Sequence, residues 1–305
     1  MNIIRIINQN KLQIIAVIIA IIIVIGIVQT LNHFAKISNQ EQNNSIANGN
    51  TTISEEDRTL SPAISGSNTK AENAENYKKA IEDFINLCNN QKPEQAYEML
   101  SNECKETMFS NYQLFYNNYY RKNFATVKTY TIQNWINSIF KVDLKEDILA
   151  TGGKTTGNIQ DFITVVSSNN QYKLNINSYI GRRPINTETD IGEIKFKVIK
   201  KDINMKYEKY YIEVENTGNT DIVLDNLNKT GTMYLQDSNE VKYSYINEEI
   251  TKELLRVKSK SKAQITIKFS NSYISDRELE KIVFSKAQIE NTDNTTKEIQ
   301  FEIKL

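Results

Sequence analysis

The chain has 305 residues, and its 37 basic and 37 acidic side chains leave no formal net charge. A neutral chain has no long-range field that attracts nucleic acid, so we expect no nucleic-acid partner. The one histidine, His33, lies near the N-terminus. The rest of the chain therefore cannot build a Ser-His-Asp triad, a Cys-His pair or a histidine-containing zinc site. No motif pairs two carboxylates for acid–base work. We expect no catalytic residue, cofactor or metal, and hence no enzyme.

An apolar run near the N-terminus is the most informative stretch of the sequence. Ile14 to Val28 contains no polar side chain. As a helix, Leu12–Leu31 would rise about 30 Å, the thickness of the hydrocarbon core of a bilayer. The alternative is a cleaved signal peptide, which needs a small-x-small site. Ala35 has His33 two positions before it and offers no such site. The sequence therefore predicts a retained transmembrane helix at residues 12–31.

The charges on the two sides of this helix predict its orientation. Arg5 and Lys11 precede it, and Lys36 alone follows it closely. The positive-inside rule then places residues 1–11 in the cytoplasm and the rest of the chain outside the cell, as a single-pass membrane protein. Residues 32–75 are mostly Ser, Asn, Gln, Thr and acidic residues without any period, which predicts a disordered linker.

Residues 76–185 have the pattern of an α+β domain. Apolar residues recur at spacings of three and four from Tyr77 to Cys88, which predicts a first helix. Pro93 suits the start of a second helix, and Ser110 with Gln113 forms the capping box of a third. From Thr126 the period changes to two. The expected strands are 126–135, 139–143, 161–167 and 172–177. Helices followed by strands predict helices packed on one face of an antiparallel sheet.

The segment from Tyr77 to Tyr120, with AYEMLS after a short turn and four strands to follow, resembles the nuclear-transport-factor-2-like superfamily. The AYEMLS pattern, with a third helix after it, looks like that of extracytoplasmic members in Gram-positive bacteria. The resemblance implies a cone-shaped domain whose helices and sheet enclose a pocket, used by different members for binding, catalysis or protein contacts. Aromatic residues at helical spacing are also typical of a core, so both alternatives stay open. The candidate pocket residues are Tyr112, Phe115, Tyr116 and Tyr119.

Residues 190–305, after a short join at Thr187–Gly192, read as strand after strand. Ile194, Phe196 and Val198 alternate with charged residues, and the same pattern recurs to the C-terminus. Eight or so short strands with polar turns predict a β-sandwich. The phrase YIEVENTGNTDIVLD resembles Ig-like extracellular domains of bacterial surface proteins. A Cys-Trp-Cys core is absent, so the resemblance is not to antibody domains.

Three motifs that suggest ligand sites can also be explained as ordinary turns or as the solvated face of a strand. Gly153-Lys154-Thr155 ends like a P-loop, but Ile148 stands where that motif needs glycine, which favours a hairpin turn. Asp225–Asn228 offers oxygen ligands, but Leu227 stands at the third ligand position of a calcium loop, which favours a polar turn. A lysine series could contact an anionic wall polymer, although its near alternation also suits the solvated face of a strand. The series is Lys258, Lys260, Lys262 and Lys268.

Cys88 and Cys104 are the two cysteines, and both fall outside the membrane, where a disulfide can form. A bridge needs the two Cα atoms within about 7 Å. An unbroken helix from Pro93 would carry Cys104 about 16 Å from its start, so a bridge requires a break near Ser101-Asn102. Two free, buried thiols are the alternative, and the sequence does not choose between them.

These patterns together predict a class of function rather than a reaction. The abundance of Asn, Ile and Lys is typical of an AT-rich genome, and we expect a low-GC Gram-positive bacterium as the source. We expect a single-pass membrane protein with two extracytoplasmic, non-catalytic domains that acts as a scaffold or contact module for envelope proteins or wall material. By resemblance, a similar arrangement is the bitopic scaffold subunit of conjugative type IV secretion systems. The alternative is a small-molecule or peptide binder that uses the pocket of the α+β domain.

Overall fold

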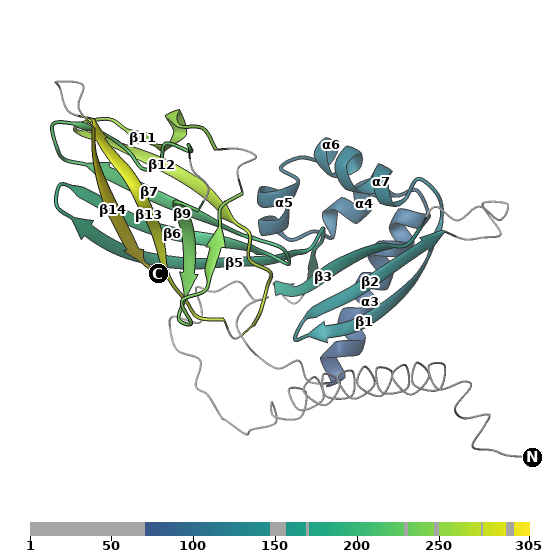
Figure 1. Cartoon of the computed structure of the whole chain (residues 1–305). Coiled ribbons are helices and arrows are strands. Elements are labelled where there is room, and N and C mark those ends of the chain that lie inside the picture. The colour runs from purple at the N-terminus through teal and green to yellow at the C-terminus, as the bar shows by residue number, and fades with distance from the viewer. Residues whose placement is uncertain are drawn as a thin grey trace, which may run out of the picture. The chain divides into compact units, whose positions relative to one another are not determined.

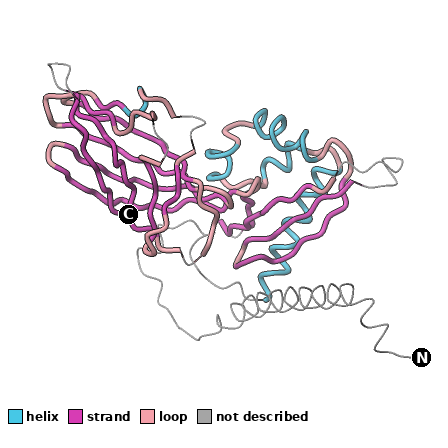
Figure 2. The backbone as a smooth tube through the Cα atoms, viewed as in Figure 1, coloured by secondary structure: helices cyan, strands magenta, loops and turns pink. Residues whose placement is uncertain are grey.

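The computed structural model describes residues 71–146, 157–168, 171–228, 231–246, 250–275, 277–290 and 296–305 (Figure 1). All of them belong to one compact unit, Ser54–Leu305. The described part is mostly β-sheet with few helices, and α+β overall (Figure 2). The transmembrane helix predicted at Leu12–Leu31 lies outside these residues. None of the described helices is both long and apolar enough to cross a membrane.

The helices come first in the chain and are short after the first one. Their bounds are α3 Ala71–Asn89, α4 Pro93–Glu98, α5 Asn102–Met108, α6 Tyr112–Phe115, the π-helix η2 Tyr116–Tyr120 and α7 Arg121–Asn123. The helix α3 begins before Tyr77, so its first residues take up the end of the segment expected to be a linker. Pro93 opens α4 as expected. The predicted capping box is wrong, because Asn111 is the N-cap of α6 and its side chain accepts from Leu114 N–H at 3.0 Å.

Four antiparallel strands follow and pair in chain order. They are β1 Lys128–Ile136, β2 Ile139–Glu146, β3 Ile159–Ser168 and β4 Gln171–Asn175. Each overlaps a strand expected from the two-residue period. The helix α3 lies behind this sheet in Figure 1 and buries Ile81, Phe84 and Ile85 in a common core with Val142 and Leu174. The opposite face of β1–β3 is open toward the viewer.

The C-terminal half forms two further sheets. One has the order β12-β7-β6-β5, and the other has the order β10-β9-β13-β8-β11, with β14 on the free side of β13. Their bounds are β5 Tyr179–Ile191, β6 Ile194–Asn204, β7 Glu208–Asn216, β8 Asp221–Val223, β9 Met233–Asp237, β10 Lys242–Ser244, β11 Arg256–Val257, β12 Ser261–Phe269, β13 Leu279–Glu290 and β14 Thr296–Lys304. A short 3₁₀ helix, Glu253–Leu255, precedes β11.

One apolar core joins these two sheets. Phe196 on β6 lies 5.2 Å from Phe301 on β14 and 6.3 Å from Phe284 on β13, between ring centroids. Ile212 and Val214 of β7 belong to the same buried cluster. The inward positions are the apolar members of the alternating runs in the sequence, which is why the period of two located these strands.

The strand β5 contradicts the expected join at Thr187–Gly192. It runs from Tyr179 to Ile191 and pairs with β6 along its length, from Tyr179 opposite Asn204 to Ile191 opposite Ile194. The core that contains α3 includes Tyr179, whereas Ile191 packs against the core of the two later sheets. A single strand therefore contributes to both cores, and no loop separates them at this point.

Candidate functional site

The predicted pocket residues lie in an aromatic cluster at the core of the helical part. Phe115 and Tyr119 are buried, whereas Tyr112 and Tyr116 are half-buried. The rings of Phe115 and Tyr119 stack at 5.9 Å. Packing of this kind gives Phe115 and Tyr119 a structural role, and a ligand pocket at this cluster stays a prediction.

A buried carboxylate that no sequence motif marks, Asp161, anchors this cluster. Asp161 Oδ2 accepts from Tyr119 Oη at 2.8 Å and from Asn177 N–H at 2.9 Å, while Oδ1 accepts from Ser178 N–H at 2.7 Å. Burial raises the pKa of Asp161, and these hydrogen bonds oppose the rise. Every one of these donors points at Asp161, so its lone pairs are used inside the fold and it is a poor candidate for catalysis.

Cys88 and Cys104 are free thiols in the structure, and both are buried. The break that a bridge requires is present, because α4 ends at Glu98 and Ser101 caps α5 by accepting from Cys104 N–H at 3.0 Å. Burial raises the pKa of the Cys104 thiol to about 12. It also raises the pKa of Cys88. Thiols of this kind are unreactive when the protein is folded.

Among the other sequence motifs, those within the described residues take part in local turns and ion pairs. Gly153-Lys154-Thr155 lies outside the described residues. Asp225 is buried and accepts from Leu227 N–H at 2.7 Å, as in a polar turn. No cluster of three His, Cys, Asp or Glu side chains that could hold a metal occurs within the described ranges. On β12, Lys262 lies 3.8 Å from Glu213 and 3.3 Å from Glu215 of the neighbouring strand, so carboxylates balance this lysine.

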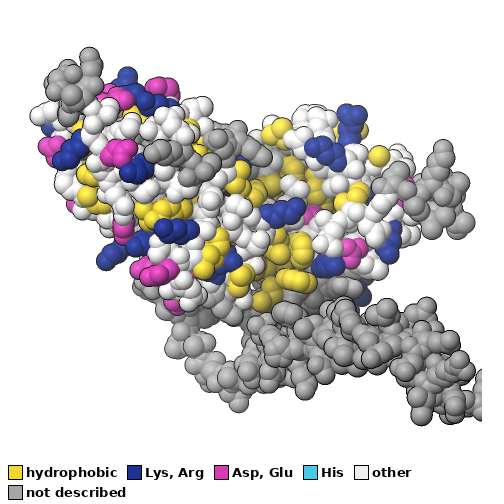
Figure 3. Space-filling view, in the orientation of Figure 1, with side chains coloured by type: hydrophobic (Ala, Val, Ile, Leu, Met, Phe, Trp, Pro, Cys, Tyr) yellow, Lys and Arg dark blue, Asp and Glu magenta, His cyan; other side chains and the backbone are white. Residues whose placement is uncertain are grey.

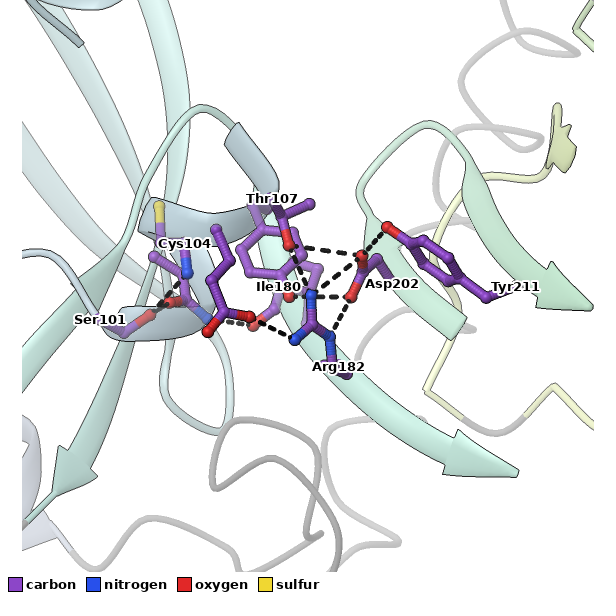
Figure 4. A network of polar contacts seen from close by, with 10 residues as sticks. Ser101, Cys104, Thr107, Ile180, Arg182, Asp202 and Tyr211 are labelled. Atoms are coloured by element: carbon purple, nitrogen blue, oxygen red, sulfur yellow. Dashed lines mark hydrogen bonds and ion pairs between the residues drawn. The ribbon is translucent and has the colours of Figure 1, made fainter. Parts of the chain in front are cut away.

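A polar network fixes α5 to the sheet of β5 and β6 (Figure 4). The guanidinium of Arg182 donates from Nε to Asp202 Oδ1 at 2.8 Å and from Nη2 to Thr107 Oγ1 at 3.0 Å. Its third nitrogen, Nη1, donates to Glu106 at 2.8 Å. Asp202 is buried and also accepts from Tyr211 Oη at 2.7 Å. Charged, hydrogen-bonded contacts of this geometry hold the helical part and the later sheets in one arrangement.

A β-bulge on β6 turns a lysine inward. Val198 is opposite Ile212, but Lys200 is opposite Tyr211, so Ile199 is an extra residue and the side-chain alternation changes phase there. Lys201 then lies opposite Tyr210 on β7 and opposite Arg183 on β5. Side chains directly opposite on neighbouring strands share a face of the sheet. Arg183, Lys201 and Tyr210 therefore form a row across three strands.

The inward lysine is part of a buried charged cluster. Lys201 Nζ lies 3.0 Å from Glu208 Oε2, and Tyr210 Oη donates to the same oxygen at 2.7 Å. All three side chains are buried. Burial lowers the pKa of Lys201 in spite of the attraction of Glu208, and the nearby Arg183 and Arg277 lower it further. The alternation Glu208, Tyr210, Ile212 in the sequence was a signal for an inward Glu208.

A cavity of about 760 Å³ opens beside this cluster. It lies where β5, the start of β13 and the end of β14 meet. Its lining includes Arg183, Ile185, Lys201, Tyr210, Arg277 and Leu279. A volume of this size is in the range of small-molecule sites.

A second feature is a pair of aromatic residues on the open face of the first sheet, one exposed and one half-buried. Trp135, the only tryptophan in the chain, is 56% exposed and packs edge-on against Phe162 at 5.5 Å. The strand pairing shifts between Asn134 and Ile136, so Trp135 lies at a bulge. Phe162 in turn packs on a small cluster of Ile139, Ile180 and Ile203. Figure 3 shows hydrophobic side chains gathered over this sheet, on the face turned to the viewer.

Comparisons with known proteins leave the family open. No protein family and no curated protein matches this sequence. Among solved structures, the crystal structure of the yjhA protein from Bacillus subtilis is similar over 40% of this chain and 98% of its own length, with 17% identity and a TM-score of 0.27. A TM-score this low carries no argument about fold or function.

Proposed function

We propose that the protein is a single-pass envelope protein of a low-GC Gram-positive bacterium and acts there as a non-catalytic contact module. In this proposal Leu12–Leu31 anchors the chain, residues 1–11 are cytoplasmic, and the folded part works outside the cell against another envelope protein or wall material. The apolar run and the two basic residues before it support this location. The helical part with its sheet is then a nuclear-transport-factor-2-like domain, and the two later sheets form an Ig-like sandwich.

The observation that carries the contact role is the exposed Trp135 packed on the half-buried Phe162. Tryptophan is enriched among the residues that dominate binding energy at protein interfaces. A 56% exposed tryptophan on an open sheet face, backed by a packed phenylalanine, has the form of such an anchor. The bulge at this position also suits the role, since bulges re-aim individual side chains.

The Arg182 network supports the same proposal. A module that holds a partner gains affinity when its surfaces do not have to be ordered on binding. The contacts of Arg182 to Asp202 on β6 and to Glu106 and Thr107 on α5 keep the helical part and the later sheets in a fixed arrangement. Such a rigid connection suits a scaffold better than a protein whose domains close around a substrate.

Two experiments test the proposal. Protease treatment of intact, wall-stripped cells should cut the chain between the anchor and the folded part and release a soluble fragment, whereas full protection of the fragment would reverse the orientation. Crosslinking in the native cell, followed by mass spectrometry, should then recover a protein of the envelope. Recovery of cytoplasmic proteins alone would contradict the proposed role.

A further inference from the structure

The lining of the cavity beside Lys201 contains three cations close to one another. Lys201 is buried, as is its neighbour Tyr210, while Arg183 is exposed and Arg277 is half-buried. Arg183 stands directly opposite Lys201 in the strand pairing, on the same face of the sheet. Two like charges placed directly opposite each other destabilise a sheet, so this pair is a cost to the fold.

The carboxylates of the described residues compensate these cations only in part. Glu208 pairs with Lys201 at 3.0 Å, and Glu302 pairs with Lys281 at the cavity rim at 2.9 Å. Arg277 donates to the Ser272 carbonyl at 2.7 Å and lies over the ring of Tyr243. Within the described residues, no carboxylate forms an ion pair with Arg183 or Arg277. Glu278 and Glu280 also line the cavity, and their side chains, like that of Arg183, are exposed to solvent.

Part of the remaining wall of the cavity is apolar. Ile185, Leu279 and Leu305 line it, and each packs against the core that joins the two later sheets. A ligand that fills the cavity therefore meets aliphatic side chains as well as cations. Sites of this composition bind molecules with one charged group and an apolar body.

We propose that this cavity is a binding site for a ligand with an oxyanion, a carboxylate or a phosphate, attached to an apolar group. The guanidinium groups of Arg183 and Arg277 bind the oxyanion, with Lys201 and the Tyr210 hydroxyl behind them. Guanidinium is suited to this task, because its planar set of donors matches carboxylate and phosphate oxygens. This inference goes beyond the envelope contact role and does not rest on it, since the cavity and the Trp135 face use different residues.

The test uses three probes on the full chain in a zwitterionic detergent. Saturation-transfer NMR observes the two leucine probes directly, and phosphate is observed through its displacement of N-acetylleucine. N-acetylleucine carries a carboxylate and an aliphatic body, N-acetylleucine amide lacks only the charge, and inorganic phosphate supplies the oxyanion alone. The carboxylate should bind at least tenfold more tightly than the amide. Displacement of N-acetylleucine by phosphate would extend the site to phosphate ligands, and binding of the carboxylate alone would assign it to carboxylates.

Variants locate the binding in this cavity. The exchanges Arg183→Gln and Arg277→Gln, made together, should weaken N-acetylleucine binding at least tenfold. Lys262→Gln, on the open face of β12, is the matched control and should leave it unchanged. Both Arg183 and Arg277 reach solvent, and a thermal unfolding curve checks that the double variant folds. Equal binding of the acid and the amide, or unchanged binding in the folded double variant, would overturn the proposal.

Discussion

Arg182 and Asp202 stand opposite each other on β5 and β6, and Nε of the guanidinium donates to a carboxylate oxygen at 2.8 Å. Asp202 is buried, and its carboxylate is stabilised by this partner and by hydrogen bonds from the hydroxyls of Tyr179 and Tyr211. The same guanidinium reaches α5. The pair therefore links the strand that crosses between the two cores to the helices of the first.

Replacing Arg182 by methionine should lower the free energy of unfolding by about 2 kcal/mol. Removing one member of a buried pair leaves an uncompensated charge, and the two tyrosine hydroxyls reduce the loss. Urea unfolding of Ser54–Leu305 measures this change in the free energy of unfolding. The control is Arg121→Met, on the exposed surface of α7, where a change within about 0.5 kcal/mol is expected. A loss for Arg182→Met no larger than for this control would contradict the role given to the pair.

Splitting the chain within β5 should destabilise both pieces. The domain bounds expected from the sequence, 76–185 and 190–305, place the cut inside β5, and this cut removes half of β5 from its pairing with β6. Each fragment should melt about 10 °C below the 71–305 chain, as a loss of about 3 kcal/mol gives at this size. Circular dichroism melting curves of the fragments equal to that of the intact chain would show that an intact β5 does not stabilise the two parts.

Cys88 and Cys104 should behave as two free thiols that are shielded in the folded state. The native protein should not react with iodoacetamide at pH 8, because burial raises the pKa of both thiols and blocks access. After unfolding without reductant, both should be alkylated. Mass spectrometry of protein taken from its native envelope counts the modified residues, and a count of zero after unfolding would establish a disulfide instead.

The stability of the fold should fall at alkaline pH. Burial raises the pKa of Cys104 to about 12 and also raises the pKa of Cys88 and Tyr119, so each is above its unfolded value. Their contribution is complete below about pH 8 and is lost as the pH rises through the folded-state pKa values. Lys201 opposes this loss of stability at alkaline pH. Its pKa is lowered in the folded state, so loss of its proton favours folding.

Urea midpoints between pH 7 and pH 11 measure this dependence. They should be constant up to about pH 8 and then decline, and the decline should be shallower in Cys104→Ala. A midpoint that rises over the alkaline range would show that Lys201 outweighs the thiols and tyrosines.

The sequence predicted the strands better than the sites. Alternation such as Ile194, Phe196, Val198 located the strands because each places a mostly apolar face on a core. It did not reveal β5, since Asn186–Ile191 is polar at an edge of its sheet and is held by pairing with β6. Ser110 and Asn111 are both good cap residues, and nothing local distinguishes them.

The row of Arg183, Lys201 and Tyr210 could not be predicted from the sequence, for a related reason. Lys200 and Lys201 look alike in the sequence, and without the bulge at Ile199 the strict alternation would have turned Lys201 outward. A bulge has no dependable sequence signature here. Trp135 continues the exposed alternate positions Thr129, Thr131 and Gln133 of β1, but the sequence does not show that Phe162 of β3 lies beside it.

A photo-crosslinking amino acid at position 135 of the full chain, expressed in its native cell, tests the central claim most directly. We predict crosslinks to a protein of the cell envelope, and their absence when the same amino acid replaces Lys262 on the open face of β12. The Trp135→Ala variant should fold normally, since this side chain is mostly exposed. No crosslinked protein at position 135, or the same pattern at both positions, would contradict the contact role of this face.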